Sequence, residues 1–393
     1  MTVSTHLADV ADSLPTDHEH ALLIGRVWDP AAQGPSPVLV TAGEVRDLSG
    51  TFATVSEITA LEDPAASVRA VDAPVIGRTA AVLAASAAAA SDVLRFLSPV
   101  DLHCVKAAGV TFAVSMIERV IEEKARGDAA AADGLRDTIV ELLGGDLRSI
   151  VPGSRAAEDL KAYLVGRGLW SQYLEVGIGP DAEIFTKTPV LASVGTGVQV
   201  GVHRSSTWNN PEPEVVLIVA PDGRVVGAAL GNDVNLRDIE GRSALLLPKA
   251  KDNNASGSLG PFIRLFDEGF GIDDVRTARV EVTVDGLDGF RLQAESDMTQ
   301  ISRDPLDLAR QLVGPHHQYP DGAALYLGTL FAPVQDRDEP GRGFTHHPGD
   351  IVRISSPRLG TLVNEVAYSD ECAPWTFGIA QLMVNLHRRG LLR

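Results

Sequence analysis

The part of the chain that most constrains its fold is a predicted β-hairpin. Residues 214–220 and 224–230 are two short, mainly apolar runs, and Pro221-Asp222-Gly223 between them is a turn sequence. With Asp222 and Gly223 as the two central turn residues, the antiparallel register places Glu212 opposite Asp233 at the open end of the hairpin. It also places Glu214 opposite Gly231.

This register brings three carboxylates together. Side chains alternate faces along a strand, so Glu212 and Glu214 share a face, and Asp233 joins them across the ladder at roughly 5 Å between Cβ atoms. Like charges this close destabilise a fold unless a cation neutralises them. Oxygen-only ligation suits Mg²⁺ or Mn²⁺ better than Zn²⁺. The hairpin therefore predicts a metal site, and the alternative is a solvated strand end.

Charge and hydropathy exclude other classes of protein. The net charge of −18 over 393 residues argues against nucleic-acid binding, which needs clustered Lys and Arg. The mean hydropathy is +0.06, and no apolar run approaches the roughly 20 residues of a membrane span. The first residues lack a signal-peptide pattern, and two isolated cysteines do not indicate a disulfide framework. We therefore expect a cytoplasmic protein that binds neither nucleic acid nor membrane.

The length of the chain favours two domains. Predicted strands at residues 21–28, 37–41 and 43–47, followed by a helix at 78–90, indicate a small β-rich unit. The proline-containing segment 97–101 marks its end. We predict a small N-terminal α/β domain over residues 1–98 and a catalytic domain over residues 99–393.

The second domain begins with helices and continues with strands. Residues 112–124 have the apolar spacing of an amphipathic helix, and residues 127–168 predict one or two more helices, either a lid or a peripheral pair. Strands are predicted at 174–178, 183–187, 279–284, 323–327 and 350–354, and a closing helix at 376–392. Short strands with Gly, Pro and Asp turns favour an α+β fold with a mixed, largely antiparallel sheet.

Several motifs of the second domain resemble the fumarylacetoacetate hydrolase family. The carboxylates Glu212 and Glu214 correspond to its E-x-E motif, N-D-V-N-L-R-D at residues 232–238 to the motif that follows, and Lys251 to its lysine before L-G-P. Further matches lie at 327–329, 348–350 and 359–364. The resemblance covers roughly residues 100–393 and implies a β-sandwich or roll. It also suggests a homodimer or homotetramer.

Within this family the chain is most similar to the 2-keto-3-deoxy-pentonate dehydratases of xylose and arabinose breakdown. The similar stretches are residues 107–115, 170–175, 208–214, 243–254 and 317–322. The family's hydrolases usually carry a histidine where this chain has Ser115, which favours elimination over C–C hydrolysis. The alternatives are an acylpyruvate or fumarylacetoacetate type of C–C hydrolase, and a non-catalytic metal-dependent binding protein.

The resemblance implies Mg²⁺-dependent conversion of a 2-keto-3-deoxy-pentonate, a small-molecule 2-keto sugar acid, to 2,5-dioxopentanoate, with Mn²⁺ or Ca²⁺ as alternative ions. A metal polarises the keto group, and the reaction then needs a base near C3 and an acid near the leaving hydroxyl. Lys251 and Glu183 are the candidates, in either order. Arg237 is a further anion-binding candidate or a structural partner of Asp238. The expected substrate-binding residues are Thr329, Lys187, Ser115, Glu118 and Arg119.

Overall fold

The structure is a computed structural model. It describes the whole chain except residues 1, 4–6, 8–9, 88–91, 127, 133–149, 167–169, 332, 334 and 393.

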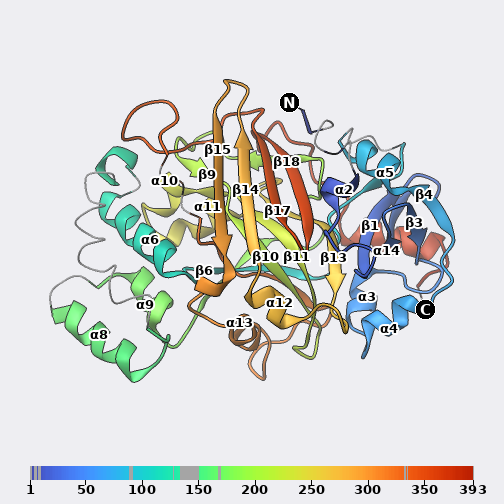
Figure 1. The fold of residues 1–393 in the computed structure, drawn as a ribbon, viewed down its shortest axis with the longest axis horizontal. Helices are drawn as coiled ribbons and strands as arrows, with labels where there is room; N and C mark the ends of the chain where they lie inside the picture. Colours follow the sequence, from blue (N-terminus) through green and yellow to red (C-terminus); the bar gives the residue numbers. More distant parts are fainter. Residues whose placement is uncertain are drawn as a thin grey trace.

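A large mixed sheet runs through the molecule (Figure 1). Its strand order is β4-β3-β2-β1-β13-β11-β10-β16-β6-β7, and β5 pairs separately with β1. Its pairings are antiparallel except between β16 and β6. The strands are β1 Leu23–Asp29, β2 Gly34–Val40, β3 Glu44–Asp47, β4 Val75–Arg78, β5 Arg95–Phe96, β6 Cys104–Gly109, β7 Glu183–Thr188, β10 Pro213–Val219, β11 Val225–Asp233, β13 Gly257–Leu265 and β16 Ala323–Tyr326.

A second sheet packs against the middle of the first. Its order is β15-β14-β17-β18-β8, and β9 pairs with β12 in a small separate ladder. Val215, Leu217 and Val219 of β10 share a core with β14 and β17, whereas Val216 and Ile218 belong to another core on the opposite face. The hairpin is therefore buried on both faces. The strands are β8 Gln199–Val202, β9 Asn209–Asn210, β12 Asn235–Leu236, β14 Arg279–Asp285, β15 Arg291–Asp297, β17 Ile351–Ser356 and β18 Gly360–Tyr368.

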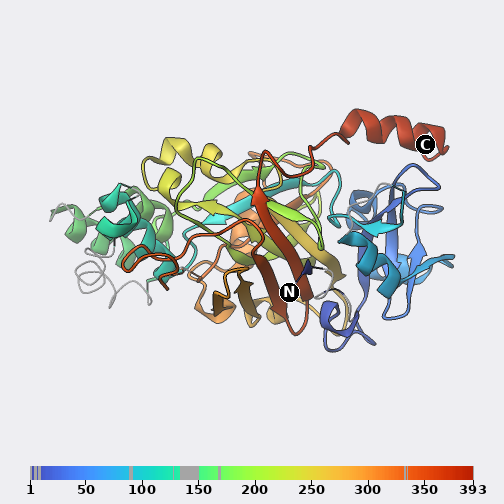
Figure 2. The same ribbon diagram turned by 90° about the horizontal axis from the view of Figure 1, so that it is seen from above.

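Helices lie around the sheets. Figures 1 and 2 show α6, α8 and α9 together at one end of the molecule and α14 beside the N-terminal strands at the other. No helix in the described part of the chain is both long and apolar enough to cross a membrane. The helices are α2 Val10–Ser13, α3 Val55–Thr59, α4 Pro64–Arg69, α5 Thr79–Ser86, α6 Ala113–Ala125, α8 Arg155–Gly166, α9 Gln172–Ile178, α10 Arg237–Glu240, α11 Leu247–Lys251, α12 Ile272–Arg276, α13 Pro305–Leu312 and α14 Ile379–Arg388, with 3₁₀ turns η2 Ala244–Leu246 and η3 Met298–Gln300.

The predicted α+β class with a largely antiparallel sheet is confirmed. The strand predicted at residues 174–178 is wrong, because this segment belongs to α9. Ser171 begins that helix as its N-cap, and its hydroxyl accepts a hydrogen bond from the backbone N–H of Tyr173 at 3.2 Å. Residues 133–149 of the predicted helical region lie outside the described residues.

The N-terminal strands continue the large sheet. Leu23 and Ile24 of β1 pair with Arg264 and Ile263 of β13, so β1 to β4 extend the sheet that contains the hairpin. The division of the chain into domains at residue 98 stays a prediction.

The hairpin has the predicted register at its open end but a different turn. Its loop has three residues, because the backbone N–H of Ala220 donates to the carbonyl of Arg224 at 2.8 Å and Gly223 adopts a φ of 87°. A β-bulge at Val226 then adds one residue to the returning strand, so pairing changes between Val219↔Val225 and Ile218↔Gly227. The bulge compensates for the longer loop and restores the predicted pair Glu214↔Gly231.

Candidate active site and metal centre

Three carboxylates converge at the open end of the hairpin. Glu212, Glu214 and Asp233 each offer an oxygen atom, and these atoms all lie within 4.8 Å of one another. The backbone N–H of Asp233 donates to the carbonyl of Glu212 at 3.0 Å, which continues the ladder by one pair beyond β10. All three residues are buried. The structure therefore brings together the three residues that the sequence predicts as metal ligands.

Glu214 is the member of this trio without a cationic partner. Among the described residues it makes no ion pair, and its carboxylate accepts a hydrogen bond of 2.6 Å from the backbone N–H of Gly328. Burial, together with the carboxylates of Asp233 and Glu212, raises the pKa of Glu214 well above its usual range. A cation placed between these carboxylates would stabilise its charged form.

Two buried lysines neutralise the other two carboxylates. The ammonium of Lys251 lies 2.5 Å from Glu212 Oε2 and 3.1 Å from Asp233 Oδ2. The ammonium of Lys187 lies 2.8 Å from Asp233 Oδ1 and also donates to the backbone carbonyls of Val234 and Lys251. Burial alone would lower the pKa of Lys251, but Asp233 and Glu212 raise it. Lys251 therefore stays protonated here, and Lys187 supports Asp233 from within the fold.

Arg119 of α6 connects the trio to a wider network of acids. Its Nη2 lies 2.6 Å from Glu212 Oε1, and its Nη1 lies 2.6 Å from Glu122 Oε2 and 3.0 Å from Glu240 Oε2. Burial opposes the charge of this guanidinium, yet the three carboxylates raise its pKa further above its usual range. One guanidinium thus links α6, α10 and the start of the hairpin.

Arg237 also binds α6, through two glutamates of that helix. Its guanidinium lies 2.7 Å from Glu122 and 3.2 Å from Glu118, and it stacks over the indole of Trp208 at 4.1 Å. The alternative that Arg237 pairs with Asp238 is wrong, because Asp238 instead accepts hydrogen bonds from Ser206 and from the backbone of Thr207.

Glu183 begins β7 and is held beside Gly109 of β6, its partner across the antiparallel ladder. A Cβ atom placed on Gly109 would lie 2.2 Å from Glu183 Oε2, so the carboxylate fills the space that any larger residue would need. Burial raises the pKa of Glu183 to about 7, with the nearby Glu240 adding to the shift. A carboxylate with this pKa can both take up and release a proton near neutral pH.

A small cavity of about 20 Å³ lies beside the trio. Four of the predicted substrate-binding residues line it, together with the predicted metal ligand Glu212: Ser115, Glu118, Arg119 and Thr329. The hydroxyl of Ser115 donates to the carbonyl of Phe112 at 2.9 Å, and that of Thr329 accepts from the backbone N–H of Phe331 at 3.1 Å. Lys187 does not line this cavity. Four of the five predicted substrate-binding residues therefore line the cavity, whereas Lys187 lies beside Asp233.

Sequence reasoning missed three groups that complete the site. Glu240 and Glu122 bind Arg119, and the hydroxyl of Tyr173 donates to the backbone carbonyl of Glu240 at 3.4 Å. Burial, followed by the charge of Glu240, raises the pKa of Tyr173. The signal in the sequence was weak: Glu122 follows Arg119 at helical spacing, whereas Glu240 and Tyr173 reach the site only through the fold.

The donor set fits a hard divalent cation. Three carboxylates at the open end of the hairpin provide oxygen ligands, and Glu214 forms no ion pair with any described side chain. The described part of the chain contains no other comparable cluster of His, Cys, Asp or Glu. Glu212, Glu214 and Asp233 are therefore the residues that would hold Mg²⁺.

Solved structures share this fold. A 2-keto-3-deoxy-D-arabinonate dehydratase, solved with magnesium and 2,5-dioxopentanoate, matches with a TM-score of 0.61 and 20% sequence identity over 88% of this chain and 99% of that chain. A fumarylacetoacetate hydrolase from Exiguobacterium antarcticum matches with a TM-score of 0.51 and 16% identity over 88% and 100% of the two chains. The protein therefore has a fold of the fumarylacetoacetate hydrolase type.

Two proteins with similar sequences are both named as sugar-acid dehydratases. The chain is 29% identical over 194 residues to a probable 2-keto-3-deoxyxylonate dehydratase from Haloferax volcanii, a match that covers 49% of this chain and only 63% of that relative. It is 27% identical over 230 residues to a 2-dehydro-3-deoxy-D-arabinonate dehydratase from Saccharolobus solfataricus, covering 58% and 71% of the two chains. No protein-family model matches. The resemblance to this family, and within it to the sugar-acid dehydratases, is confirmed, and both relatives are named as dehydratases.

Proposed function

We propose that the protein is a Mg²⁺-dependent hydro-lyase of pentose catabolism that converts a 2-keto-3-deoxy-pentonate, derived from D-xylonate or L-arabinonate, to 2,5-dioxopentanoate. The observation that carries the proposal is the buried trio Glu212, Glu214 and Asp233, next to a carboxylate whose pKa is about 7. The names of both sequence relatives support the same reaction class.

The trio would hold the ion. When bound, Mg²⁺ would polarise the keto group of the substrate and make its C3 protons acidic. Mn²⁺ and Ca²⁺ are alternatives, because both accept carboxylate oxygens. Lys251 forms an ion pair with Glu212 and Lys187 forms one with Asp233, and these contacts fix the two carboxylates in place, so the ligands are preorganised for the cation.

Glu183 and Lys251 would divide the proton transfers. Glu183, as a carboxylate, removes a proton from C3, and the electron pair of that C–H bond forms the C3–C4 double bond as the C4 hydroxyl leaves. The hydroxyl departs as water with a proton from the protonated Glu183 or from the ammonium of Lys251. Moving a proton from C5 to C3 of the unsaturated acid then gives the C4=C5 enol. Transfer of the enol's hydroxyl proton to C4 gives the terminal aldehyde of the product.

The side chains around the small cavity would move apart to contact the rest of the substrate, because the cavity of about 20 Å³ has room for about one water molecule. The hydroxyl groups of Ser115 and Thr329 can hydrogen-bond to a carboxylate or to sugar hydroxyls, and Arg119 supplies positive charge at the same wall. The family's hydrolases usually carry a histidine at the position of Ser115, and a serine has no basic ring with which to activate water. The replacement of histidine by serine favours elimination over C–C hydrolysis.

A coupled assay tests the proposal. The protein is incubated with Mg²⁺ and a 2-keto-3-deoxy-pentonate, and a semialdehyde dehydrogenase reports the aldehyde as NAD(P)H. We expect NAD(P)H formation that stops on chelation and is abolished in Glu214→Gln, whereas Glu281→Gln, on an exposed position of β14, behaves as the wild type. Folded protein that forms no aldehyde but releases pyruvate from an acylpyruvate would be a hydrolase instead. Tight binding of the sugar acid without turnover would indicate a binding protein.

The remaining expectations are part of this proposal. The protein would act as a homodimer or homotetramer on a small-molecule acid, in the cytoplasm, with neither nucleic acid nor membrane as partner. Sedimentation at working concentration measures the oligomeric state.

A further inference from the structure

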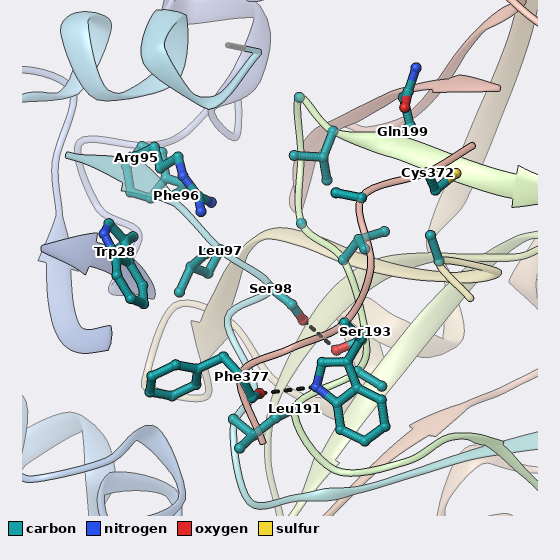
Figure 3. Close-up of a pocket in the computed structure, with 18 of the residues that line it drawn as sticks. Trp28, Arg95, Phe96, Leu97, Ser98, Leu191, Ser193, Gln199, Cys372 and Phe377 are labelled. Atoms are coloured by element: carbon teal, nitrogen blue, oxygen red, sulfur yellow. Dashed lines mark hydrogen bonds between the residues drawn. The ribbon is translucent and has the colours of Figure 1, made fainter. Parts of the chain in front are cut away.

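A second, larger cavity lies away from the carboxylate trio. Its volume is about 780 Å³, and it is bounded by β1 and β5, by residues 191–199 and by residues 372–377 (Figure 3). None of the residues that hold or surround the trio lines it. The proposed reaction therefore makes no use of this cavity.

A buried arginine forms part of its wall. Arg26 of β1 is 5% exposed, and its Nε and Nη1 atoms have no hydrogen-bond partner among the described residues. The charge of Asp101 favours that of Arg26, but the Asp101 carboxylate already accepts hydrogen bonds from the backbone N–H groups of Val55, Ser56 and Leu102. Burial lowers the pKa of Arg26 to about 10, which still leaves it charged at neutral pH. An unmatched buried charge of this kind is costly to the fold.

A second arginine and several aromatic rings share the cavity. Arg95 of β5 lies opposite Trp28 of β1 in the ladder, and Trp28 shares the strand face of Arg26. Figure 3 shows Trp28, Arg95 and Phe96 on one side of the cavity and Phe377 and Leu191 on another. The hydroxyls of Ser98 and Ser193 share a hydrogen bond of 2.8 Å in the same wall. The cavity thus combines two arginines and one glutamate, Glu365, with large apolar surfaces.

We propose that this cavity binds an organic carboxylate with an apolar or aromatic body, whose carboxylate pairs with the guanidinium of Arg26. The pairing supplies hydrogen-bond acceptors to donors that lack them, and the rings cover the body of the ligand. A neutral ligand of the same shape would leave the guanidinium unpaired. Charge, rather than shape alone, therefore sets the preference of the site.

Calorimetric titration of the full chain with matched pairs tests this site. 1-Naphthoate and 1-naphthalenemethanol form the aromatic pair, and decanoate and decanol form the aliphatic pair. We expect the wild type to bind at least one acid about tenfold or more tightly than its alcohol, and the pair with the larger ratio identifies the type of body. Equal affinity for acid and alcohol in both pairs, or no binding of either acid, would overturn the proposal.

The variant Arg26→Met locates the binding. It should weaken acid binding by about tenfold or more while leaving alcohol binding and turnover unchanged. Arg279→Met, the same substitution at an exposed position of β14, is the matched control. Glu214→Gln should leave acid binding intact, which separates this cavity from the trio. Unchanged acid affinity in folded Arg26→Met would contradict the assignment of the carboxylate to Arg26. If that variant does not fold, the comparison of acid with alcohol in the wild type still decides whether the cavity prefers a carboxylate.

Discussion

Gly109 and Glu183 are cross-strand partners in which the absence of one side chain makes room for the other. The Glu183 carboxylate lies where a Cβ of residue 109 would be, with Oε2 only 2.2 Å from that position. The glycine therefore sets the position of a group that we propose transfers the proton.

Gly109→Ala should reduce activity without unfolding the protein. The clashing atom is the end of a flexible side chain, so Glu183 can move aside, but a displacement of about 1 Å can cost on the order of 100-fold in rate. We expect a fall in kcat of that order with a nearly unchanged melting temperature. Gly43→Ala is the control, since nothing lies within 4 Å of its added methyl group. Wild-type kcat in Gly109→Ala would show that the position of Glu183 is unimportant.

Activity should depend on the ionisation of Glu183. Since its pKa is about 7 and the proposed base is the carboxylate, kcat/KM should fall about tenfold for each pH unit below that value. Glu183→Gln should lower kcat by roughly 100- to 10,000-fold and remove this acidic limb from the remaining activity. A pH profile of the coupled assay, with the dehydrogenase in excess at every pH, measures both effects. An unchanged acidic limb in Glu183→Gln would assign it to another group.

Glu183 should also affect stability in a defined direction. Its pKa is higher in the folded protein than in the unfolded chain, so the folded protein binds the proton more tightly. Its contribution to the free energy of unfolding is fully present below about pH 4.5 and is lost as pH rises through about 7. Urea denaturation at several pH values should show this dependence in the wild type and a weaker one in Glu183→Gln. An identical dependence in both proteins would contradict the shift.

Arg119 should be among the most important side chains for stability. Arg119→Met leaves Glu122, Glu212 and Glu240 without the cation that joins them, and breaking a buried ion pair typically costs about 3–5 kcal/mol. Arg155→Met removes only exposed ion pairs and should change the free energy of unfolding by less than about 1 kcal/mol. Urea denaturation compares the two variants. Similar small effects would show that the network contributes little.

Mg²⁺ should stabilise the protein through the carboxylate trio. An ion present at about 100 times its dissociation constant adds about 2.7 kcal/mol to the free energy of unfolding. Glu214→Gln should lose this increase, and without Mg²⁺ it should be at least as stable as the wild type, because a charge is removed from a repulsive cluster. Thermal melts with and without Mg²⁺ measure the difference. A full Mg²⁺ response in Glu214→Gln would place the ion elsewhere.

The sequence alone predicts those parts of the site that are formed by residues close together along the chain. The hairpin register follows from two apolar runs and a turn, and it brings Glu212, Glu214 and Asp233 together. The prediction of a two-residue turn was nevertheless wrong. Its register survived because one extra loop residue is offset by one extra strand residue, Val226.

The surroundings of the trio were beyond sequence reasoning because they depend on packing between distant segments. Glu240 and Tyr173 reach Arg119 only once α6, α9 and α10 are assembled. The segment at 174–178 alternates well enough to resemble a strand, and the capping hydroxyl of Ser171 was the competing signal. The family resemblance identifies Lys251, whereas the sequence offers Lys187 only as a candidate for binding the substrate. The structure buries Lys187 completely and pairs it with Asp233.

The bulge at Val226 links the spacing of the chain to the chemistry at its far end. Removing one residue between Val219 and Gly227 would slide the returning strand by a single step and turn the side chain of Asp233 to the opposite surface. The hairpin would remain apolar and able to pair, yet one of its three acidic groups would point into the wrong core. Insertions or deletions at this tip are thus compatible with function only when a second change of length compensates for the first. In related proteins, the number of residues between the two strands should differ by an even number, or a longer or shorter loop should be matched by the gain or loss of a bulge.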